Sequence, residues 1–465
     1  MFIKDTDDWA EELFGKADLG DNRRTKRLVK LSSQMATHTG MSVVQAAGDS
    51  ASIEGAYRFI RNQAVQASDI AQAGFEALLP HLSQSATILA LEDTTTLSYQ
   101  HAVSKELGNT GTKPDCQHKG MWAHSVLMVD ADSEKTLGLG EQSRWCRKDE
   151  NHGQRHERHK RAYEDKESVK WQRTSEAMAS RYAPVMDRII SVCDRESDIF
   201  EYMTYKQAAQ QRFVVRVNHD RALQDSEVKL KEHIGDQSST ASYQVKVKQK
   251  GGRKARTAKV AVRHAEVVIS APKKHPALAP LTLNVLSCDE IGVPKGVAPL
   301  CWRLYTTEPI GSMDDALKIV RYYELRWRVE EFHKAWKSAG TQVESLRLQK
   351  RKNLEKMIVI TAFVSIRLLQ LRELVSDTSQ AKETCCSSFF NDVEWRLLWS
   401  KTESKPIPQK PPSLFWAYYA LAKLGRWYDS KHTGRVGWNA LWKGWYNLTQ
   451  LIDGARLVQN IVVKM

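Results

Sequence analysis

Short apolar runs alternate with helical stretches between residues 87 and 217. The runs Thr87–Leu91 (TILAL) and Ile189–Cys193 (IISVC) have the length and apolar content of buried strands. Further strands are expected at Ala123–Val129, Thr136–Gly140 and Arg212–Val217, and helices at Glu167–Met186 and Asp198–Gln210. Strands and helices that alternate in this way predict an α/β fold, in which helices cover the faces of a sheet.

The segments on either side of this region have different patterns. Residues 1–66 carry apolar residues at helical spacing, which predicts a small helical module. Residues 218–310 contain β-like runs punctuated by glycine and proline, at Tyr243–Lys248, Thr257–Arg263, Leu281–Leu286 and Cys301–Thr306. Helical spacing returns at Ser312–Gly340 and Asn353–Leu374. We therefore expect a central domain at residues 67–375 with a β-rich insertion at about residues 218–310.

Residues 376–465 form the third predicted domain. Ser376–Pro412 is polar and contains PIPQKPP, which predicts an irregular linker. Leu414–Met465 is predicted to be helical, and apolar residues follow helical spacing at Trp438, Leu441, Trp442, Trp445, Leu448 and Ile452. This spacing is typical of an amphipathic core helix and, equally, of a helix that binds a partner.

The charge of the chain points to a polyanionic partner. Lys and Arg number 69 against 55 Asp and Glu, a formal net charge of +14, and such an excess is typical of proteins that bind nucleic acid. Asn22–Lys30 (NRRTKRLVK) holds five basic residues and no acid. The longest apolar stretch, Met357–Ile366, is too short for a membrane span, and the acidic start MFIKDTDDW lacks the apolar region of a secretory signal. We therefore expect a cytoplasmic protein without a membrane partner.

Two of the predicted strands end in aspartate. Asp93 follows TILALE and Asp194 follows IISVC. In open α/β sheets the functional crevice lies beyond the carboxyl ends of the strands. Two carboxylates there would repel each other unless they shared a cation, and Mg²⁺ prefers oxygen ligands. Strand-end aspartates are also common as turn formers and helix caps, so this pattern leaves both roles open.

The predicted helix Ser312–Gly340 carries a stripe of polar residues. On an ideal helix Arg326, Glu330 and Lys337 lie within about 60° of Tyr323. The opposite face is apolar and carries Leu325, Val329, Phe332 and Trp336. The alternative to a functional stripe is a solvated face, held by ion pairs of Glu330 with Arg326 and Lys334.

The two aspartates and Glu330 together fit a site that acts on phosphodiesters. Three carboxylates can hold two divalent cations about 4 Å apart, which activate a water or a 3′ hydroxyl and stabilise the leaving oxygen. Arg326 and Lys337 would bind a phosphate, the arginine through two parallel hydrogen bonds.

The motifs around these residues resemble a known family. Asp93 in LEDTT, Asp194 in CDRESDI and Glu330 in YELRWRVEEFHKAWK are similar to the three acids of bacterial DDE cut-and-paste transposases. The last motif resembles the Tyr–Arg–Glu–Lys signature of that family, here Tyr323, Arg326, Glu330 and Lys337. Further similar motifs are LGDNRRTKRL, EGAYRFIRN, RFVVR, NLEKM, RLLQLRE, DSKHTG and WNALWKGW.

The resemblance implies a fold, a reaction and partners. The expected fold is a ribonuclease H-like α/β catalytic core with a β-rich insertion, between an N-terminal helical DNA-binding domain and a C-terminal helical dimerisation domain. The expected partners are double-stranded DNA, as transposon ends and target, and a second copy of the chain in a paired-end complex. The acids would bind two divalent ions, Mg²⁺ with Mn²⁺ as a substitute. Cleavage would pass through a hairpin before the 3′ ends join target DNA.

The residues expected to contact DNA come from the basic N-terminal cluster and from positions similar to the family motifs. They are Arg23, Arg24, Arg27, Tyr57, Arg58, Arg216, Trp302, Tyr323, Arg326, Lys334, Lys337 and Arg347. The resemblance implies that Trp302 receives a base flipped out of the duplex during hairpin formation; the alternative is a buried strand aromatic. His333 is expected either to touch phosphate or to be solvated.

Other functional interpretations are kept or discounted on the same residues. A ribonuclease H-like endonuclease that cuts without joining remains an alternative, and so does a catalytically silent DNA-binding regulator. The regulator is disfavoured because the three acids and the Arg/Lys pair are present. A zinc site formed by His152, His156, His159 and Cys146 is disfavoured, because their polar context has no recognised ligand spacing.

Overall fold

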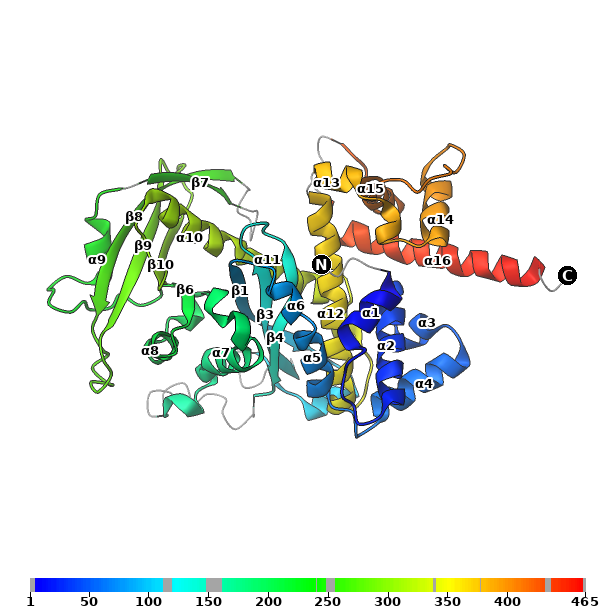
Figure 1. Ribbon diagram of the computed structural model, residues 1–465, viewed down its shortest axis with the longest axis horizontal. Helices are drawn as coiled ribbons and strands as arrows, with labels where there is room; N and C mark the ends of the chain where they lie inside the picture. The colour runs from blue at the N-terminus through cyan, green and yellow to red at the C-terminus, as the bar shows by residue number, and fades with distance from the viewer. Residues whose placement is uncertain are drawn as a thin grey trace.

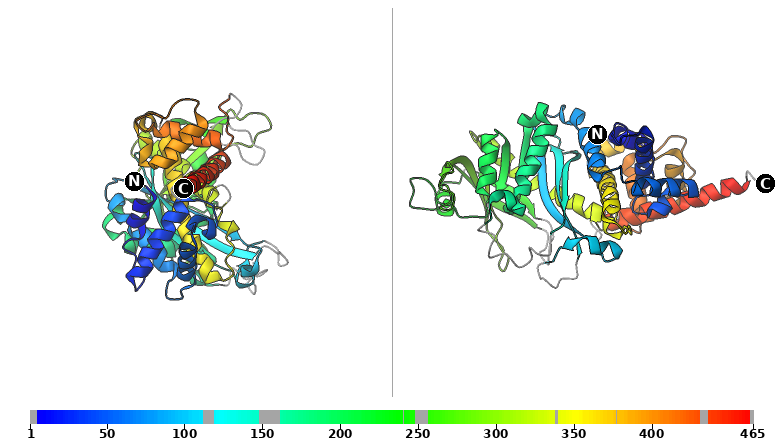
Figure 2. Two further views of the ribbon diagram at one scale, coloured as in Figure 1. Left: turned by 90° about the vertical axis from the view of Figure 1, so that its right-hand side faces the viewer. Right: turned by 90° about the horizontal axis from the view of Figure 1, so that it is seen from below.

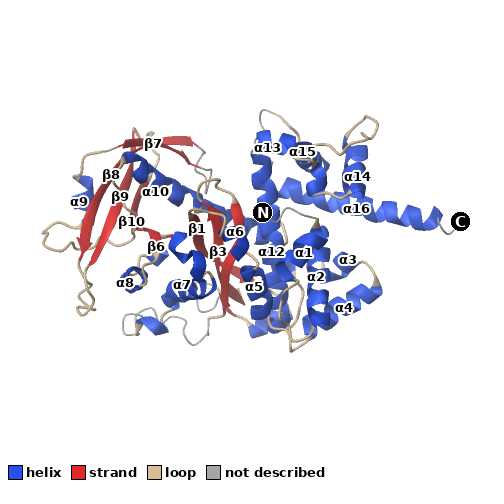
Figure 3. Ribbon diagram, in the orientation of Figure 1, coloured by secondary structure: helices blue, strands red, loops and turns tan. Residues whose placement is uncertain are grey.

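The structure is a computed structural model that describes residues 5–111, 119–147, 161–239, 241–247, 256–337, 340–376, 378–430 and 436–462. A large mixed sheet forms one side of the molecule, and two groups of helices form the other (Figure 1). The long helix α12 (Arg351–Ser376) runs between the sheet and these helices. The fold is therefore a mixed α/β core flanked by helices, as Figure 3 shows by element type.

The described residues form a ten-stranded sheet with the order β2-β3-β1-β5-β6-β10-β9-β8-β7, and β4 pairs with β3. Its first half consists of β1 (Ile88–Ser98), β2 (Gly108–Asn109), β3 (Lys119–Asp130), β4 (Thr136–Trp145), β5 (Ile189–Cys193) and β6 (Arg212–Arg216). Strand β1 is antiparallel to β3 and parallel to β5, and β5 is parallel to β6. These strands confirm the α/β pattern expected between residues 87 and 217.

The insertion extends the same sheet. It contains α9 (Leu230–Gly235), β7 (Ala241–Val247), β8 (Arg256–Ile269), β9 (Leu281–Ile291) and β10 (Cys301–Thr306). Each of the four strands was expected from the sequence. They form an antiparallel array, and β10 joins it to the core by pairing antiparallel with β6.

Helices cover both faces of the sheet. On one face α7 (Lys170–Arg181) and α8 (Phe200–Ala208) place Trp171 and Phe200 in one core with the strand residue Val215. On the other face, alternate strand residues join the larger core that contains α11 (Trp327–Lys337) and α12. The helix expected at Glu167–Met186 is shorter, because a 3₁₀ turn that contains Pro184 follows α7.

The N-terminal helices share the core of the sheet domain. They are α1 (Thr6–Phe14), α2 (Asn22–Thr37), α3 (Val43–Ala47), α4 (Ser50–Arg61), α5 (Ala67–Glu76) and α6 (Leu79–Leu82). Phe14 meets Phe363 of α12 edge to face, with ring centroids 5.4 Å apart. The helical module expected at residues 1–66 thus packs directly on α12.

The helix expected at Ser312–Gly340 is two helices. α10 (Met313–Leu325) ends at Arg326, and α11 (Trp327–Lys337) begins after it. The amide of Arg326 bonds to Tyr323 O (3.2 Å), and the amide of Val329 bonds to Arg326 O (3.2 Å). These bonds span three residues instead of four, so the α-helical ladder is interrupted at Arg326.

The C-terminal helices build a second core. They are α13 (Thr378–Glu383), α14 (Asp392–Thr402), α15 (Leu414–Leu424) and α16 (Trp438–Val462). The linker expected at Ser376–Pro412 is wrong, because α14 lies there with a capping box of Asn391 and Glu394 and with Trp395 buried. The continuous helical segment expected from Leu414 is also interrupted, between α15 and α16.

Helix α16 joins the N-terminal and C-terminal groups. Trp445 Nε1 donates a hydrogen bond to Thr37 O at the end of α2 (2.9 Å). Figure 2 shows that the outer part of α16 extends beyond the rest of the molecule. Leu457 and Val458 in this part are 62% and 59% exposed, so an apolar surface is presented there.

Candidate active site

Asp93 and Asp194 lie side by side on two neighbouring parallel strands. Asp194 follows the last residue of β5, as expected, whereas Asp93 lies within β1, which continues to Ser98 and does not end in aspartate. Leu91 of β1 pairs with Val192 of β5, and the chain continues two residues in each case to an aspartate. Neighbouring strands lie about 4.8 Å apart, so the two carboxylates share one edge of the crevice. Asp194 also caps a 3₁₀ turn, because its Oδ1 accepts the amide of Glu196 (2.9 Å). Asp194 therefore has the capping role that the sequence left open, whatever other role it has.

Glu330 of α11 lies across from these aspartates. Its carboxylate accepts a hydrogen bond from Arg326 Nη2 (3.1 Å). The pKa of Asp93 is raised to about 7, chiefly because the carboxyl is buried; Arg326 lowers this pKa, and the negative charges of Asp194 and Glu330 contribute to raising it. The three carboxylates therefore act on one another in one electrostatic site, with Arg326 as their positive neighbour.

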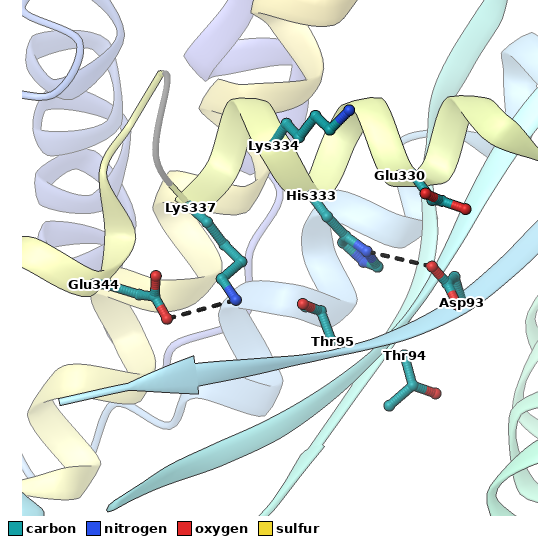
Figure 4. Close-up of a pocket in the computed structure, with 8 residues that line it drawn as sticks. All are labelled: Asp93, Thr94, Thr95, Glu330, His333, Lys334, Lys337 and Glu344. Atoms are coloured by element: carbon teal, nitrogen blue, oxygen red, sulfur yellow. Dashed lines mark ion pairs between the residues drawn. The ribbon is translucent and has the colours of Figure 1, made fainter. Parts of the chain in front are cut away.

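A cavity of about 440 Å³ opens beside Asp93 and Glu330. It is lined by Asp93, Thr94, Thr95, Glu330, His333, Lys334, Lys337 and Glu344 (Figure 4). Lys337 Nζ lies 3.6 Å from Glu344 Oε1, and the same carboxylate oxygen accepts the amide of Ser98 (2.8 Å). Glu344, which the sequence analysis did not single out, therefore holds Lys337 toward β1.

His333 is buried between α11 and β1. Its side chain is 8% exposed, and Nδ1 lies 3.7 Å from Asp93 Oδ2. The pKa of His333 is lowered to about 3, chiefly because the ring is buried and in part because of the positive charge of Lys337. A solvated histidine is thus wrong. The ring is neutral, and Figure 4 shows it directed at Asp93.

A second, larger cavity of about 1210 Å³ adjoins Glu330 on the other side. Among its lining residues are Arg195, Arg216, Trp302, Tyr323, Arg326 and Glu330. Trp302 and Tyr323 meet edge to face with ring centroids 5.4 Å apart. Arg216 Nη1 donates to the hydroxyl of Tyr323 (3.4 Å). The structure therefore brings together residues that are more than 100 positions apart in the sequence.

Tyr323 and Arg326, two members of the predicted polar stripe, do not belong to a solvated helix face. Tyr323 is 5% exposed, with its ring held by Trp302 and Arg216. In the part of the chain that the structure describes, Arg326 Nε and Nη1 are buried without a hydrogen-bond partner. Buried donors of this kind are costly unless a ligand or water satisfies them. The Arg326 guanidinium is therefore suited to an anion that enters the cavity.

Lys334 lines the smaller cavity, whereas Arg347 lines neither of the two cavities. Lys334 is exposed, with Nζ 5.4 Å from the centroid of the Trp327 ring. Arg347 is exposed in the segment that follows α11. Figure 4 shows Lys334 on the side of α11 that faces away from β1, unlike Lys337.

Helices α2 and α4, which carry the basic residues of the N-terminal module, lie on the far side of α12 from the sheet (Figure 1). The Arg23 side chain is 91% exposed and forms an ion pair with Asp21. Arg24 Nη1 donates to Leu19 O (2.7 Å), and the Arg27 guanidinium packs against Gly55 of α4. On α4, Tyr57 is half-buried beneath Arg61, and Arg58 is exposed and paired with Glu54.

The donor set of the site suits a hard divalent cation. Asp93, Asp194 and Glu330 offer only oxygen atoms, which are the ligands that such a cation prefers. Among the described residues, no three acidic, histidine or cysteine side chains are close enough to form a closed metal site. The Glu330 carboxylate is hydrogen-bonded to Arg326 and not drawn in toward the two aspartates. The residues His152, His156 and His159 of the disfavoured zinc site lie outside the described residues.

Two further observations bear on the class of protein. No helix in the described ranges combines the length and the apolar character needed to cross a bilayer. The cysteines of the described part are free thiols.

Comparison with protein families identifies two regions of the chain. Residues 6–65, which contain α1 to α4, match the family described as "Transposase DNA-binding". Residues 173–366, which contain Asp194, Trp302, Arg326 and Glu330, match the "Transposase DDE domain". Asp93 lies ahead of that second match, and the pairing of β1 with β5 places it beside Asp194. Together the two matches cover more than half of the chain, and they show that it belongs to the DDE transposases.

Proposed function

We propose that the protein binds the ends of a transposon, cleaves them through a hairpin intermediate and joins their 3′ ends to target DNA. The observation that carries this proposal is the single electrostatic site formed by Asp93, Asp194 and Glu330, next to a buried arginine with unpaired donors. The Tyr–Arg–Glu–Lys signature adds a likeness to the transposase of the Tn-five transposon.

The residues around the site divide into two roles in this proposal. Asp93, Asp194 and Glu330 would hold the divalent ions, Mg²⁺ or Mn²⁺, whose chemistry is to activate a water or 3′ hydroxyl and to stabilise the leaving oxygen. Arg326 would bind a phosphate through its unpaired Nε and Nη1. Arg216 and Tyr323 line the same cavity as Arg326, and Lys337 lines the cavity on the other side of Glu330, so in this proposal they would hold DNA on either side of the carboxylates.

The proposed domain functions follow the order of the chain. Residues 1–66 would bind DNA, residues 67–375 would form a ribonuclease H-like catalytic domain, and residues 376–465 would dimerise. The strand order β4-β3-β1-β5-β6, with β1, β5 and β6 parallel, supports the ribonuclease H-like assignment. The exposed apolar residues of α16 support pairing with a second copy. We place such a protein in the bacterial cytoplasm, where its DNA lies.

A strand-transfer assay tests the proposed function. A duplex with the terminal inverted repeat that borders the gene, supplied with a free 3′ hydroxyl, is incubated with the protein, Mg²⁺ and a supercoiled target plasmid. The proposal predicts covalent joining of the 3′ end to the plasmid. Cleavage of uncut ends without joining would instead support the endonuclease, and binding without either reaction would support the regulator.

Arg23 provides a test of end binding that does not disturb the fold. Its side chain is almost fully exposed, whereas Arg24 and Arg27 also support the N-terminal module. If Arg23 contacts only phosphate, Arg23→Ala should weaken binding to all duplexes alike and reduce the slope of log K against log[salt] by about 1. If it reads a base, the loss should be about 1–3 kcal/mol, chiefly on the transposon end.

Electrophoretic mobility shifts at several NaCl concentrations measure this effect. Lys410→Ala is the matched control, because it removes one exposed positive charge outside the N-terminal module. Equal binding by wild type and Arg23→Ala on both duplexes would remove Arg23 from the DNA interface.

A further inference from the structure

The turn between β3 and β4 contains a residue with an unusual backbone. Glu134 adopts φ 54°, in the left-handed region that favours glycine. Its side chain is 30% exposed, so no hydrophobic burial explains why a long charged residue lies there. The contacts of the side chain provide an explanation.

The carboxylate of Glu134 reaches α10. Arg321 Nε donates to Glu134 Oε1 and Arg321 Nη2 donates to Oε2, both at 2.6 Å. The pKa of Glu134 is lowered, chiefly by these bonds. The remaining Arg321 nitrogen, Nη1, donates to Glu324 Oε2 (3.0 Å), and the hydroxyl of Tyr243 in β7 donates to the same oxygen (2.7 Å). The end of α10 is thereby tied to the turn and to the insertion.

The same turn also reaches α11. Arg328 Nη1 donates to the backbone oxygen of Glu134, and Arg328 Nη2 lies 3.8 Å from Glu134 Oε2. Arg328 Nη1 also donates to Glu373 Oε1 of α12 (3.0 Å), and Glu373 accepts the amide and hydroxyl of Thr136 in β4. Glu134 therefore contacts one arginine on each side of the helix break.

The helix break lies between these two contacts, and it carries Arg326 and, shortly after it, Glu330 of the candidate active site. Arg321 lies five positions before Arg326, and Arg328 lies two positions after it. Glu330, which accepts a hydrogen bond from Arg326, follows within the first turn of α11. A change in the angle between α10 and α11 would thus move Arg326 and Glu330 relative to Asp93.

We propose that Glu134 is a positioning residue that fixes the angle between α10 and α11, and with it the placement of Arg326 and Glu330. The catalytic consequence rests on the proposed function; the structural claim does not. Single exposed ion pairs contribute little to stability, but a two-bond arginine pair within a network of several charges is the favourable case. The effect of Glu134 should therefore be local order at the break and not overall stability.

Two variants of the full chain separate the side chain from the backbone. Glu134→Gln keeps the size of the side chain and removes its charge. Glu134→Gly removes the side chain and relieves the left-handed backbone, so a residue that only shaped the turn would be improved by it. Asp225→Gly is the matched control, because Asp225 is an exposed acid with φ 55° in the insertion.

Hydrogen–deuterium exchange read by mass spectrometry tests the structural claim. Amides of residues 320–332 should exchange several-fold faster in both Glu134 variants, with unchanged exchange in α7, α8 and α16 and an unchanged melting temperature. Asp225→Gly should exchange like wild type in that segment. Wild-type exchange at residues 320–332 in Glu134→Gln, or equal acceleration in the control, would overturn the proposal.

Nicking of a duplex transposon end in Mg²⁺ tests the catalytic consequence. Glu134→Gln should nick about 10- to 100-fold more slowly, as expected for reacting groups displaced by a fraction of an ångström to 1 Å, with end affinity unchanged. Faster exchange with wild-type nicking would overturn the positioning role. If wild type itself does not nick, the proposed function fails, and the exchange result still decides whether Glu134 holds the break.

Discussion

Asp194→Ala is expected to abolish nicking of transposon ends in Mg²⁺ and to leave end binding intact. Asp194 follows β5 and lies beside Asp93 of the neighbouring strand β1, and its charge contributes to the raised pKa of Asp93. Loss of one of three carboxylates that hold divalent ions should slow cleavage by at least about 1,000-fold. End binding should persist, because helices α2 and α4, which carry the N-terminal basic residues, lie on the far side of α12.

Asp194→Asn is the control that separates the charge from the cap. The Asp194 side chain caps a 3₁₀ turn by accepting the amide of Glu196, and an asparagine oxygen can accept the same bond. Both variants should lose nicking if the carboxylate holds a cation. Wild-type nicking by Asp194→Asn, together with loss in Asp194→Ala, would reduce Asp194 to a structural cap. Gel analysis of a 5′-labelled duplex end measures the nicking rate of both variants.

Trp302→Ala is expected to nick normally and to accumulate nicked ends with few hairpins. Hairpin formation requires a sharp bend of one strand, and a base flipped out of the duplex relieves that bend at a cost of a few kcal/mol. Stacking on an indole recovers about 1–3 kcal/mol, so hairpin formation should slow by about 5- to 150-fold. Trp302 lines the cavity that also contains Arg326 and Glu330, which gives a base a route to it.

Trp302→Phe is the conservative control, and a mismatched pre-nicked end is the rescue. The Trp302 ring also packs against Tyr323, so the Ala variant could disturb the site by loss of packing. Phe keeps an aromatic surface and should restore most of the hairpin rate. A mismatched end has a base that is already loose, so it should partly restore the Ala variant. Equal loss of nicking and of hairpins would identify Trp302 as a packing residue.

The strands could be predicted because burial leaves a local pattern. IISVC is apolar except for Ser191 and is buried on both faces in β5, and the four strands of the insertion are bounded by glycine and proline. That Asp93 lies beside Asp194 could not be derived from the strand pattern, because nothing in the sequence states which strands are neighbours. The parallel register of β1 and β5 is a property of the folded sheet.

The break at Arg326 could not be predicted from periodicity. No glycine or proline marks it, and an unbroken helix brings Tyr323, Arg326 and Glu330 to one face equally well. The break is supported by distant partners, of which Glu134 contacts Arg321 and Arg328. Long-range ion pairs of this kind leave no local signal.

Two other differences have separate physical causes, the first long-range and the second local. His333 lies next to Phe332 at the edge of the apolar face of α11, and only its contact with β1 decides that it is buried. Helix α14 was hidden by the polar, proline-containing composition of residues 376–412. The capping pair Asn391 and Glu394, followed by Trp395, was the signal that could have found it.

The central claim is that the carboxylates of Asp93, Asp194 and Glu330 together hold the divalent ions. Electron paramagnetic resonance of Mn²⁺, titrated into the protein bound to a pre-cleaved transposon end, measures this without any reaction. The account predicts about two tightly bound Mn²⁺ per active site in wild type. It also predicts loss of that binding in the Asp93→Asn, Asp194→Asn, Glu330→Gln triple variant, with the DNA still bound. Equal Mn²⁺ binding by wild type and the triple variant would contradict it.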